Sequence, residues 1–508
     1  MEKKTTQTEI NQILWEASDT FRGKIDSSIY KDYILVMLFM KYLSDTYREH
    51  LEKYTERYEG NEERIKRAMS RERFVLDEES TFDYLYSKRN SPEVGEEINK
   101  VLERLETENA GKLRGVFRNI DFNSEAVLGQ TKDRNAMLRT LIEDFAKLDL
   151  RPSKLEENDV IGDSYQFMIE RFASDAGKKG GEFFTPSMVS ELLSRLVKPE
   201  ENDRIYDPTA GSGSLLIRTV NQVPNKKVAI YGQERNGQTH SLCKMNMFLH
   251  GIDDAKIEWG DTLSNPLHLE DGKLMKFQVV VANPPFSLDK WSMGFAGGDS
   301  DTKFKMEANL DPHGRFDWGV PPKSRGDYAF VQHMLYSLAE DGRMAVILPH
   351  GTLFRGGSEK RIRKQIIEMN LLDAVIGLPE KLFFGTGIPA CIMVFKKDRT
   401  KKEVLFIDAS GEENYEKGKN QNKLREKDIE KIVETYENYE TIDKYSYVTN
   451  IEEIKENDYN LNIPRYVDTF EEEEPVDMEE VAENIDNIKS ELKEVEAEME
   501  RYLEELGL

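Results

Sequence analysis

Residues 279–286 read Val279-Val280-Val281-Ala282-Asn283-Pro284-Pro285-Phe286. The apolar half predicts a buried β-strand, and the two prolines cannot continue a hydrogen-bonded ladder. The strand therefore ends at a polar residue, with an aromatic ring just beyond it. The side-chain carbonyl of Asn283 and the backbone carbonyl of Pro284 can converge on one amino group while Phe286 lies against the ring that bears it. These residues predict a site for an exocyclic amine on an aromatic base, and the alternative is an ordinary Asn-Pro turn.

The composition is that of a soluble protein with two or three domains. The chain has 508 residues, of which 38% are hydrophobic and 33% are charged. No apolar run approaches the ~20 residues that cross a bilayer, and the polar N-terminus lacks the apolar core of a signal peptide. We therefore expect a cytoplasmic protein with no membrane partner. The two cysteines, Cys243 and Cys391, lie far apart in apolar segments, so we expect core cysteines and no metal site.

The formal net charge is −25. Tight nonspecific binding to DNA needs a concentrated basic surface that neutralises phosphates. The acidic balance therefore argues against such binding by this chain alone. If the substrate is DNA, we expect another chain to supply much of the DNA-binding affinity.

The first part of the chain, residues 1–165, shows helical periodicity and little strand signal. Apolar residues such as Ile13, Leu14, Ala17 and Phe21 recur at helical spacing, and the segment 33–43 is apolar nearly all round, as in the buried helix of a bundle. We expect an all-α N-terminal domain. Two roles remain open for it: a module that interacts with partners or embraces DNA, and a helical cap over the next domain.

Strands and helices alternate after Asp203, which predicts a doubly wound α/β domain over residues 166–410. The expected strands are 204–206, 228–231, 256–259, 277–282, 344–348, 374–378 and 388–395, and the expected helices include 214–220, 239–250, 328–338 and 359–369. Such a sheet binds ligands at the carboxyl ends of its strands. Those ends are the places where we look for functional residues.

A glycine-rich segment precedes this domain. Thr185-Pro186 stands before an apolar periodic run, which predicts a helix with Thr185 as N-cap and proline at its first position. Phe183 and Phe184 then lie at a junction between loop and helix. They either line a pocket for a planar ligand or pack beneath the loop.

Polar residues follow three of the expected strands. The first is Asp207-Pro208-Thr209-Ala210-Gly211-Ser212-Gly213-Ser214, whose glycines let a ligand approach the backbone at a helix N-terminus. Leu216 replaces the third glycine of a dinucleotide fingerprint, which favours a ligand without a pyrophosphate. Glu234, about 20 residues later, is placed to accept hydrogen bonds from ribose hydroxyls, and Asp261 from an adenine amine. Together these residues predict a nucleoside site.

In this order, F-F-T-P, D-P-T-A-G-S-G, G-Q-E and N-P-P-F resemble the N6-adenine DNA methyltransferases that use S-adenosylmethionine. Trp15, Phe21-Arg22-Gly23 and the segments 347–355, 384–389 and 460–466 extend the resemblance over nearly the whole chain, to the modification subunit of type I restriction-modification systems. The resemblance implies a Rossmann-like methyltransferase domain.

The resemblance also implies roles for individual residues. Glu234 would hold the ribose hydroxyls and Asp261 the adenine amine of S-adenosylmethionine, while Asn283, Pro284, Pro285 and Phe286 would form the catalytic motif. The methionine end of the cofactor would be enclosed by Glu182, Phe183, Phe184, Thr185, Pro186, Ser187, Asp207, Gly211, Ser212, Gly213 and Ser214. Adenine would have to be flipped out of the DNA duplex to reach this site.

The α/β rhythm fades after Phe395, and the mostly acidic remainder holds no long basic region for target recognition. We expect an acidic connecting region over 411–470. Glu471–Pro475 then predicts a solvated break at the start of a C-terminal helical tail, 471–508. A heptad seam in that tail predicts a coiled-coil-type docking helix, and the alternative is a helix packed back on its own protein. The seam consists of Val481, Ile485, Ile488, Leu492, Val495, Met499, Tyr502 and Leu506.

The expected partners follow from the resemblance. It implies two modification chains bound to one specificity subunit, with a restriction nuclease subunit in the full complex. Three other functions compete with this interpretation: a protein glutamine N-methyltransferase, a stand-alone adenine methylase, and a binding module that has lost catalysis.

Overall fold

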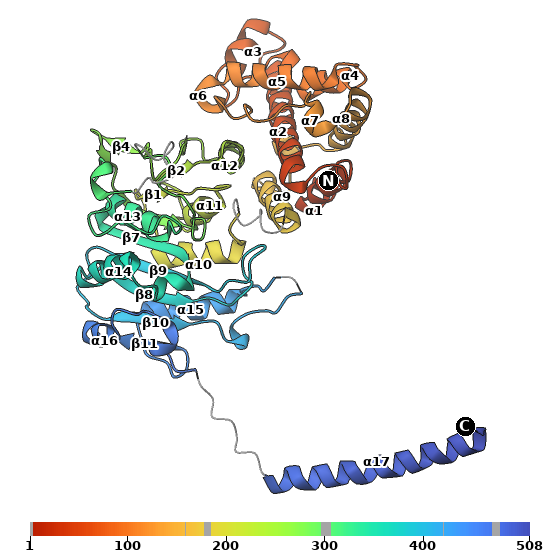
Figure 1. Cartoon of the computed structure of the whole chain (residues 1–508). Coiled ribbons are helices and arrows are strands. Elements are labelled where there is room, and N and C mark those ends of the chain that lie inside the picture. Colours follow the sequence, from red (N-terminus) through yellow and green to blue (C-terminus); the bar gives the residue numbers. More distant parts are fainter. Residues whose placement is uncertain are drawn as a thin grey trace. The chain divides into compact units, whose positions relative to one another are not determined.

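Figure 1 shows the protein as a computed structural model, which describes residues 4–157, 159–176, 184–295, 306–419, 421–469 and 478–507. Contacts divide the chain into two compact units, Met1–Val467 and Asp468–Leu508. In the described part of the chain, no helix is both long enough and apolar enough to cross a membrane.

Helices fill the first part of the larger unit, as predicted. The longest, α2, begins after Asp26, whose side chain accepts a hydrogen bond from the Ser28 amide, and it buries an apolar run from Tyr33 to Met40. α1 begins with a capping box between Thr6 and Glu9. The helices are α1 (Gln7–Asp19), α2 (Ser27–Arg57), α3 (Glu62–Met69), α4 (Phe82–Lys88), α5 (Val94–Glu108), α6 (Ala110–Leu113), α7 (Glu125–Leu128), α8 (Thr131–Phe145) and α9 (Val160–Ala176).

These helices pack against the sheet-bearing part through α12 (Gly237–Leu249), which α9 and α2 both contact. Leu242, Met245 and Phe248 of α12 belong to the apolar core of the helical part. The Arg73 guanidinium, which follows α3, donates to the Asp253 carboxylate, with 2.8 Å between Nε and Oδ2. The N-terminal helices thus form a cap over the sheet-bearing part. Their contact with DNA stays a prediction.

A nine-stranded sheet forms the centre of the larger unit (Figure 1), in the order β11-β10-β8-β9-β7-β6-β1-β2-β3. β3, β2, β1, β6 and β7 run parallel, and β9 lies antiparallel between β7 and β8. This arrangement confirms the doubly wound α/β class, in which the strand order reverses beside β1. The strands are β1 (Arg204–Asp207), β2 (Ala229–Glu234), β3 (Lys256–Trp259), β6 (Phe277–Ala282), β7 (Leu338–Pro349), β8 (Leu372–Gly377) and β9 (Ala390–Lys396), and a separate hairpin joins β4 (Leu269–Glu270) to β5 (Lys273–Leu274).

Helices cover both faces of this sheet. α10 (Ser187–Val197) and α11 (Ser214–Asn221) share one apolar core with the sheet, and residues of α13 (Asp327–Ser337) and α14 (Ser358–Glu368) belong to another. All seven expected strands and the four expected helices are present. β9 begins two residues later than predicted, after Pro389, which has no amide hydrogen for the ladder.

The prediction that the α/β rhythm ends after Phe395 is wrong. β10 (Val404–Asp408) pairs with β8, and β11 (Ser446–Thr449) pairs with β10, while α15 (Glu426–Asn438) packs against α10. The acidic composition hid α15 because only one face, with Ile429, Ile432 and Tyr436, is buried. α16 (Ile451–Glu456) follows. The domain boundaries at 165, 410 and 470 stay predictions.

The second unit contains α17 (Met478–Leu506), which confirms the predicted helix. Seven of the eight seam residues are exposed large hydrophobics in the structure, and Val495 is 62% exposed. The side chain of Val481 and the segment Glu471–Pro475 lie outside the described residues. α17 therefore carries an apolar stripe along its whole described length.

Candidate active site

A cavity of about 800 Å³ opens at the carboxyl ends of the central strands. Its lining includes residues that end or follow β1, β2, β3 and β6: Pro208, Thr209, Glu234, Arg235, Asn236, Asp261, Thr262, Asn283 and Pro285. The neighbouring strands β1 and β6 are the point where the strand order reverses, since β1 has β2 on one side and β6 on the other. Ligands bind at that point in doubly wound sheets. The structure thus brings Glu234, Asp261 and Asn283 to one cavity.

Asp207 and Glu234 end β1 and β2. Asp207 is buried, and its Oδ1 accepts from the Thr209 amide at 2.8 Å. Burial raises the pKa of Asp207 to about 7, against the hydrogen bond from that amide. Burial also raises the pKa of Glu234. Ionising these two buried carboxyls is therefore costly. A ligand that carries positive charge would stabilise their ionised forms.

The turn between β1 and α11 depends on two glycines. Gly211 and Gly213 have φ angles of 55° and 81°, in the left-handed region that other residues rarely adopt. The Gly211 amide donates to Glu234 Oε2 at 2.9 Å. Ser212 and Ser214 are buried, and their hydroxyl oxygens lie 2.9 Å apart. The two serine side chains are thus engaged with each other, and neither lines the cavity.

Asp261 follows β3 and faces the cavity. Its Oδ1 accepts from the Leu263 amide at 3.0 Å, and its Oδ2 lies 3.8 Å from Arg235 Nη1. The neighbouring Thr262 donates its hydroxyl to the Pro208 carbonyl at 2.6 Å, which ties the loop after β3 to the loop after β1. The carboxylate keeps acceptor capacity toward the cavity.

Asn283 is held by a residue from the loop before α10. Its Nδ2 donates to Thr185 Oγ1 at 3.0 Å, so the amide oxygen is the atom left for another donor. Phe286, three residues on, is partly buried and meets Phe383 edge to face, with ring centroids 5.6 Å apart. The strand end therefore presents an acceptor beside an aromatic ring.

The segment around Thr185 departs from one prediction. α10 begins at Ser187 with Pro186 at its N-cap position, so Thr185 is not the N-cap. The Thr185 hydroxyl accepts from Asn283. Phe184 is buried in the apolar core of the helical part, where its ring centroid lies 6.0 Å from that of Phe384. Glu182 and Phe183 lie outside the described residues.

Three cavity residues come from α2 in the N-terminal helical part: Ser28, Ile29 and Lys31. No local signal in the sequence points to them, because they lie almost 180 residues before β1. Thr262 and Asn236 also went unpredicted. Asn236 could have been found from its position after β2, where its side chain caps α12 by accepting from the Gln238 and Thr239 amides.

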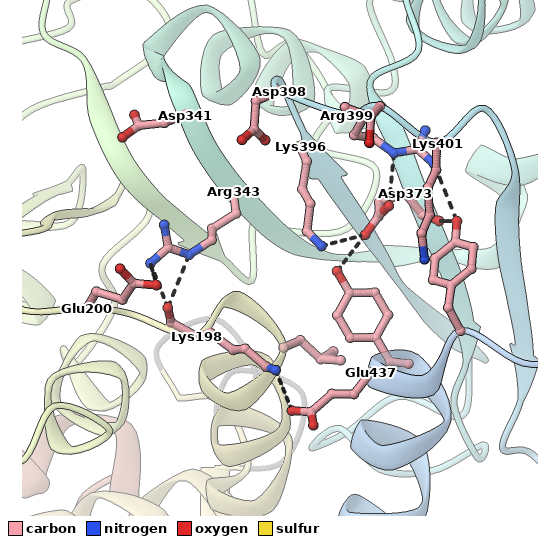
Figure 2. A pocket seen from close by; sticks show the side chains of 14 residues that line it. Lys198, Glu200, Asp341, Arg343, Asp373, Lys396, Asp398, Arg399, Lys401 and Glu437 are labelled. Atoms are coloured by element: carbon pink, nitrogen blue, oxygen red, sulfur yellow. Dashed lines mark hydrogen bonds and ion pairs between the residues drawn. The ribbon is translucent and has the colours of Figure 1, made fainter.

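A second cavity, of about 460 Å³, lies near the amino ends of β7 and β8 (Figure 2). Several of its charged side chains are paired: Asp373 accepts from Arg399 and lies 3.0 Å from Lys396 Nζ, while Lys198 Nζ lies 2.7 Å from Glu437 Oε1. Tyr436 also donates to Asp373, at 2.6 Å. These contacts fasten α15 and β9 to β8, and we assign a structural role to this cavity.

Comparison with known proteins agrees with this geometry. The profile of the N-6 DNA Methylase family matches residues 156–475, and that of the HsdM N-terminal domain matches residues 10–145. The type I restriction enzyme MpnII methylase subunit of Mycoplasma pneumoniae is 33% identical, over 92% of this chain and 91% of its own length.

Two further relatives extend the match. The MjaVII methylase subunit of Methanocaldococcus jannaschii is 34% identical, over 91% of this chain and 78% of its own length. The crystal structure of a type I restriction-modification methyltransferase subunit from Streptococcus thermophilus has 34% identity and a TM-score of 0.77, and the match covers 91% of this chain and all of that one. The chain therefore belongs to the N-6 DNA methylase family, as an adenine-specific DNA methyltransferase of the kind that forms the methylase subunit of type I restriction enzymes.

Proposed function

We propose that this chain transfers a methyl group from S-adenosylmethionine to N6 of an adenine flipped out of DNA, and that a separate specificity chain chooses the adenine. One observation carries the proposal: a single cavity holds two carboxylates at consecutive strand ends and the acceptor amide of Asn283. The two carboxylates can bind a nucleoside, and the Asn283 amide oxygen can accept a hydrogen bond from an amine.

The residues present fit the cofactor. Asp207 and Glu234 are carboxyls with raised pKa values, which a cationic ligand would stabilise in their charged form. Glu234 is assigned to the ribose hydroxyls and Asp261 to the adenine amine. The methionine end is assigned to Asp207, the turn from Gly211 to Ser214 and the segment 182–187. Bound S-adenosylmethionine supplies an electrophilic methyl group.

The catalytic role falls to Asn283 and Pro284. The lone pair of the adenine amine is delocalised into its ring, so the nitrogen is a poor nucleophile. Two carbonyl acceptors draw the amine hydrogens into one geometry and favour a pyramidal nitrogen whose lone pair can react. Neither acceptor is a strong base, so positioning and electrostatics supply the catalysis. The bond from Asn283 to Thr185 prepares the amide oxygen for this role.

Phe286 and Pro285 would receive the flipped base. Extracting a base from the duplex costs a few kcal/mol. Stacking on an aromatic side chain returns ~1–3 kcal/mol per base in single-strand binders. Phe286 is braced by Phe383, so its ring has a defined orientation for this contact.

We test the catalytic assignment with Asn283→Ala. The variant should bind S-adenosylmethionine with near-normal affinity, because the carboxylates at the ends of β1 to β3 are untouched. Loss of an aligned polar group at a reacting centre costs about 100-fold or more in turnover. Calorimetry gives the affinity, and chromatography of digested DNA measures N6-methyladenine. Asn225→Ala, in an exposed loop, is the control, and near-normal methylation by Asn283→Ala would refute the assignment.

The partners are also proposed. The curated relatives are named as subunits of type I restriction enzymes, which supports an assembly with other chains. We assign α17 to the contact with the specificity chain, with two copies of this chain for each specificity chain and a nuclease subunit in the full complex. The exposed seam of α17 supports a helix-to-helix contact.

A further inference from the structure

The residue after the N-P-P-F motif adopts a rare backbone conformation. Ser287 has a φ angle of 50°, in the left-handed region where residues other than glycine are uncommon. Such a conformation persists only where surrounding contacts hold it. Those contacts come from α13 and from the segment before α14.

Asp327, the first residue of α13, supplies the main contact. Its Oδ1 accepts from the Ser287 amide at 2.7 Å, and its Oδ2 lies 3.3 Å from the Ser287 hydroxyl. The side chain is only 1% exposed. A buried carboxylate thus accepts a hydrogen bond from the backbone amide of the residue directly after Phe286.

Arg355 completes the arrangement. Its Nη1 donates to Asp327 Oδ2 at 3.0 Å, and its Nη2 to the Ser287 hydroxyl at 3.4 Å. Glu359, also buried, lies 3.5 Å from the same Nη1. Burial raises the pKa of Glu359, against the pull of Arg355. The guanidinium therefore compensates the charge that Asp327 carries into the interior.

A second set of bonds ties the same loop to the residues before α13. The Gly326 amide donates to the Leu288 carbonyl at 3.0 Å, and the Lys290 amide donates to the Lys323 carbonyl at 2.9 Å. Leu288 itself lines the proposed active-site cavity. The loop after the motif is therefore fastened at Ser287 and again at Leu288 and Lys290.

We infer that Asp327 is a positioning residue for adenine methylation, which fixes the Pro284 carbonyl and the Phe286 ring through Ser287. The inference rests on the proposed role of the N-P-P-F motif. Ser287, Asp327 and Arg355 are called the motif strut below. Asp327 touches neither the base nor the cofactor, and it acts through the backbone of the motif.

Asparagine cannot replace this aspartate without conflict. The Ser287 amide and the Arg355 guanidinium are both donors, and they approach different oxygens of Asp327. The amide nitrogen of an asparagine would have to face one of them, donor against donor. Asp327→Asn thus disturbs the strut with almost no change in volume.

Asp428 provides a matched control far from the motif. It is a buried aspartate in the first turn of α15, 4% exposed, that accepts from the Arg425 amide and from Nε of the same arginine, both at 2.8 Å. It thus repeats the chemistry of Asp327 in a different part of the sheet. Asp428→Asn should lower the melting temperature as Asp327→Asn does, while leaving methylation at the wild-type rate.

The experiment compares both variants in the assembly in which the wild-type chain methylates DNA. We expect Asp327→Asn to lower kcat by about 10- to 100-fold, since a displacement of about 1 Å at a reacting centre costs about 100-fold. The affinity for S-adenosylmethionine should stay within about twofold, because the strut does not reach the carboxylates. Ser287→Ala keeps the amide and should lose less than about threefold, because it removes only the long contacts of the hydroxyl.

A spectroscopic readout separates positioning from folding. With 2-aminopurine in place of the target adenine, flipping out of the base stack should raise its fluorescence. Asp327→Asn should weaken the rise that accompanies capture of the flipped base, while Asp428→Asn does not. If Asp327→Asn kept the wild-type kcat and the wild-type rise in fluorescence while Asn283→Ala was inactive, the strut alone would be overturned. An active Asn283→Ala would overturn the proposed function, and the strut with it.

Discussion

At the scale of single residues, the burial of Asp207 makes ligand binding at the proposed site depend on pH. Burial raises its pKa to about 7, so the free protein carries it largely protonated below neutral pH. A cationic ligand favours the ionised form. We therefore expect proton release to accompany the proposed binding of S-adenosylmethionine.

This linkage predicts a pH dependence with a definite sign. Affinity for S-adenosylmethionine should rise by up to about eightfold between pH 6 and pH 7.5 as Asp207 loses its proton. The range lies below the pKa of about 7.7–8.0 of an α-amino group, so titration of the ligand contributes little. Calorimetry at constant ionic strength measures the change.

Two variants identify the group. Asp207→Asn should give an affinity that barely changes over this range. Asp203→Asn should keep the dependence, since this buried aspartate lies at the other end of β1 and is bonded to Arg343 at 2.7 Å. A flat profile in the wild-type chain would show that Asp207 does not titrate on binding.

At the scale of elements, the sequence predicted most of the sheet because buried parallel strands read as apolar runs. β6 and β8 are of this kind, and the polar residues that follow β1, β2 and β3 identified the cavity. β10, α15 and β11 were missed for a different reason. Acidic residues on the solvent face of α15 dominated the composition, while the apolar positions that join it to α10 are few.

The candidate site was predicted where neighbouring residues act together and was missed where distant segments meet. Asn283, Glu234 and Asp261 each follow a strand, so local patterns placed them. Ile29 lines the cavity, and Asp327 contacts the residue after the N-P-P-F motif, only because the chain folds back on itself. No local sequence pattern predicts such contacts. The hydroxyls of Ser212 and Ser214 bond to each other, an arrangement that the glycine turn alone does not reveal.

The seam of α17 gives a prediction for assembly. Val495→Glu places a charge in the middle of the apolar stripe, at a residue that is 62% exposed in the chain by itself. We expect loss of co-purification with the specificity chain, because burying an unpaired charge is costly. Ala497→Glu, on the opposite side of the heptad, should leave assembly unchanged.

Deleting residues 478–508 should have the same effect as Val495→Glu, with binding of S-adenosylmethionine retained. Pull-down of the co-expressed chain measures assembly, and calorimetry measures the cofactor. Co-purification at wild-type yield after the deletion would show that α17 is not the docking helix.

At the scale of the whole molecule, the N-terminal helices and the sheet share one cavity. Ser28, Ile29 and Lys31 of α2 line it together with the ends of β2 and β3, and Arg73 fastens the same helical part to Asp253. Binding of S-adenosylmethionine should therefore stabilise the first turn of α2, although that turn lies far from the methyltransferase motifs in sequence.

Hydrogen exchange tests this coupling. S-adenosylmethionine should slow exchange in the segment 27–34 as well as in the loops after β1, β2 and β3, because the ligand restricts opening of the cavity wall. The peptide 131–145, which forms α8 away from the cavity, serves as the internal control. Protection confined to residues 205–285 would show that α2 does not take part.

The division of labour between chains is the central claim at this scale. We propose that this acidic chain methylates an amine but depends on another chain to present the adenine. The most direct measurement is tritium transfer from S-adenosylmethionine to DNA, with and without the co-expressed specificity chain, followed by nucleoside analysis. We predict label in N6-methyladenine only when both chains are present. Label at another base, or equal methylation of DNA by this chain alone, would contradict the account.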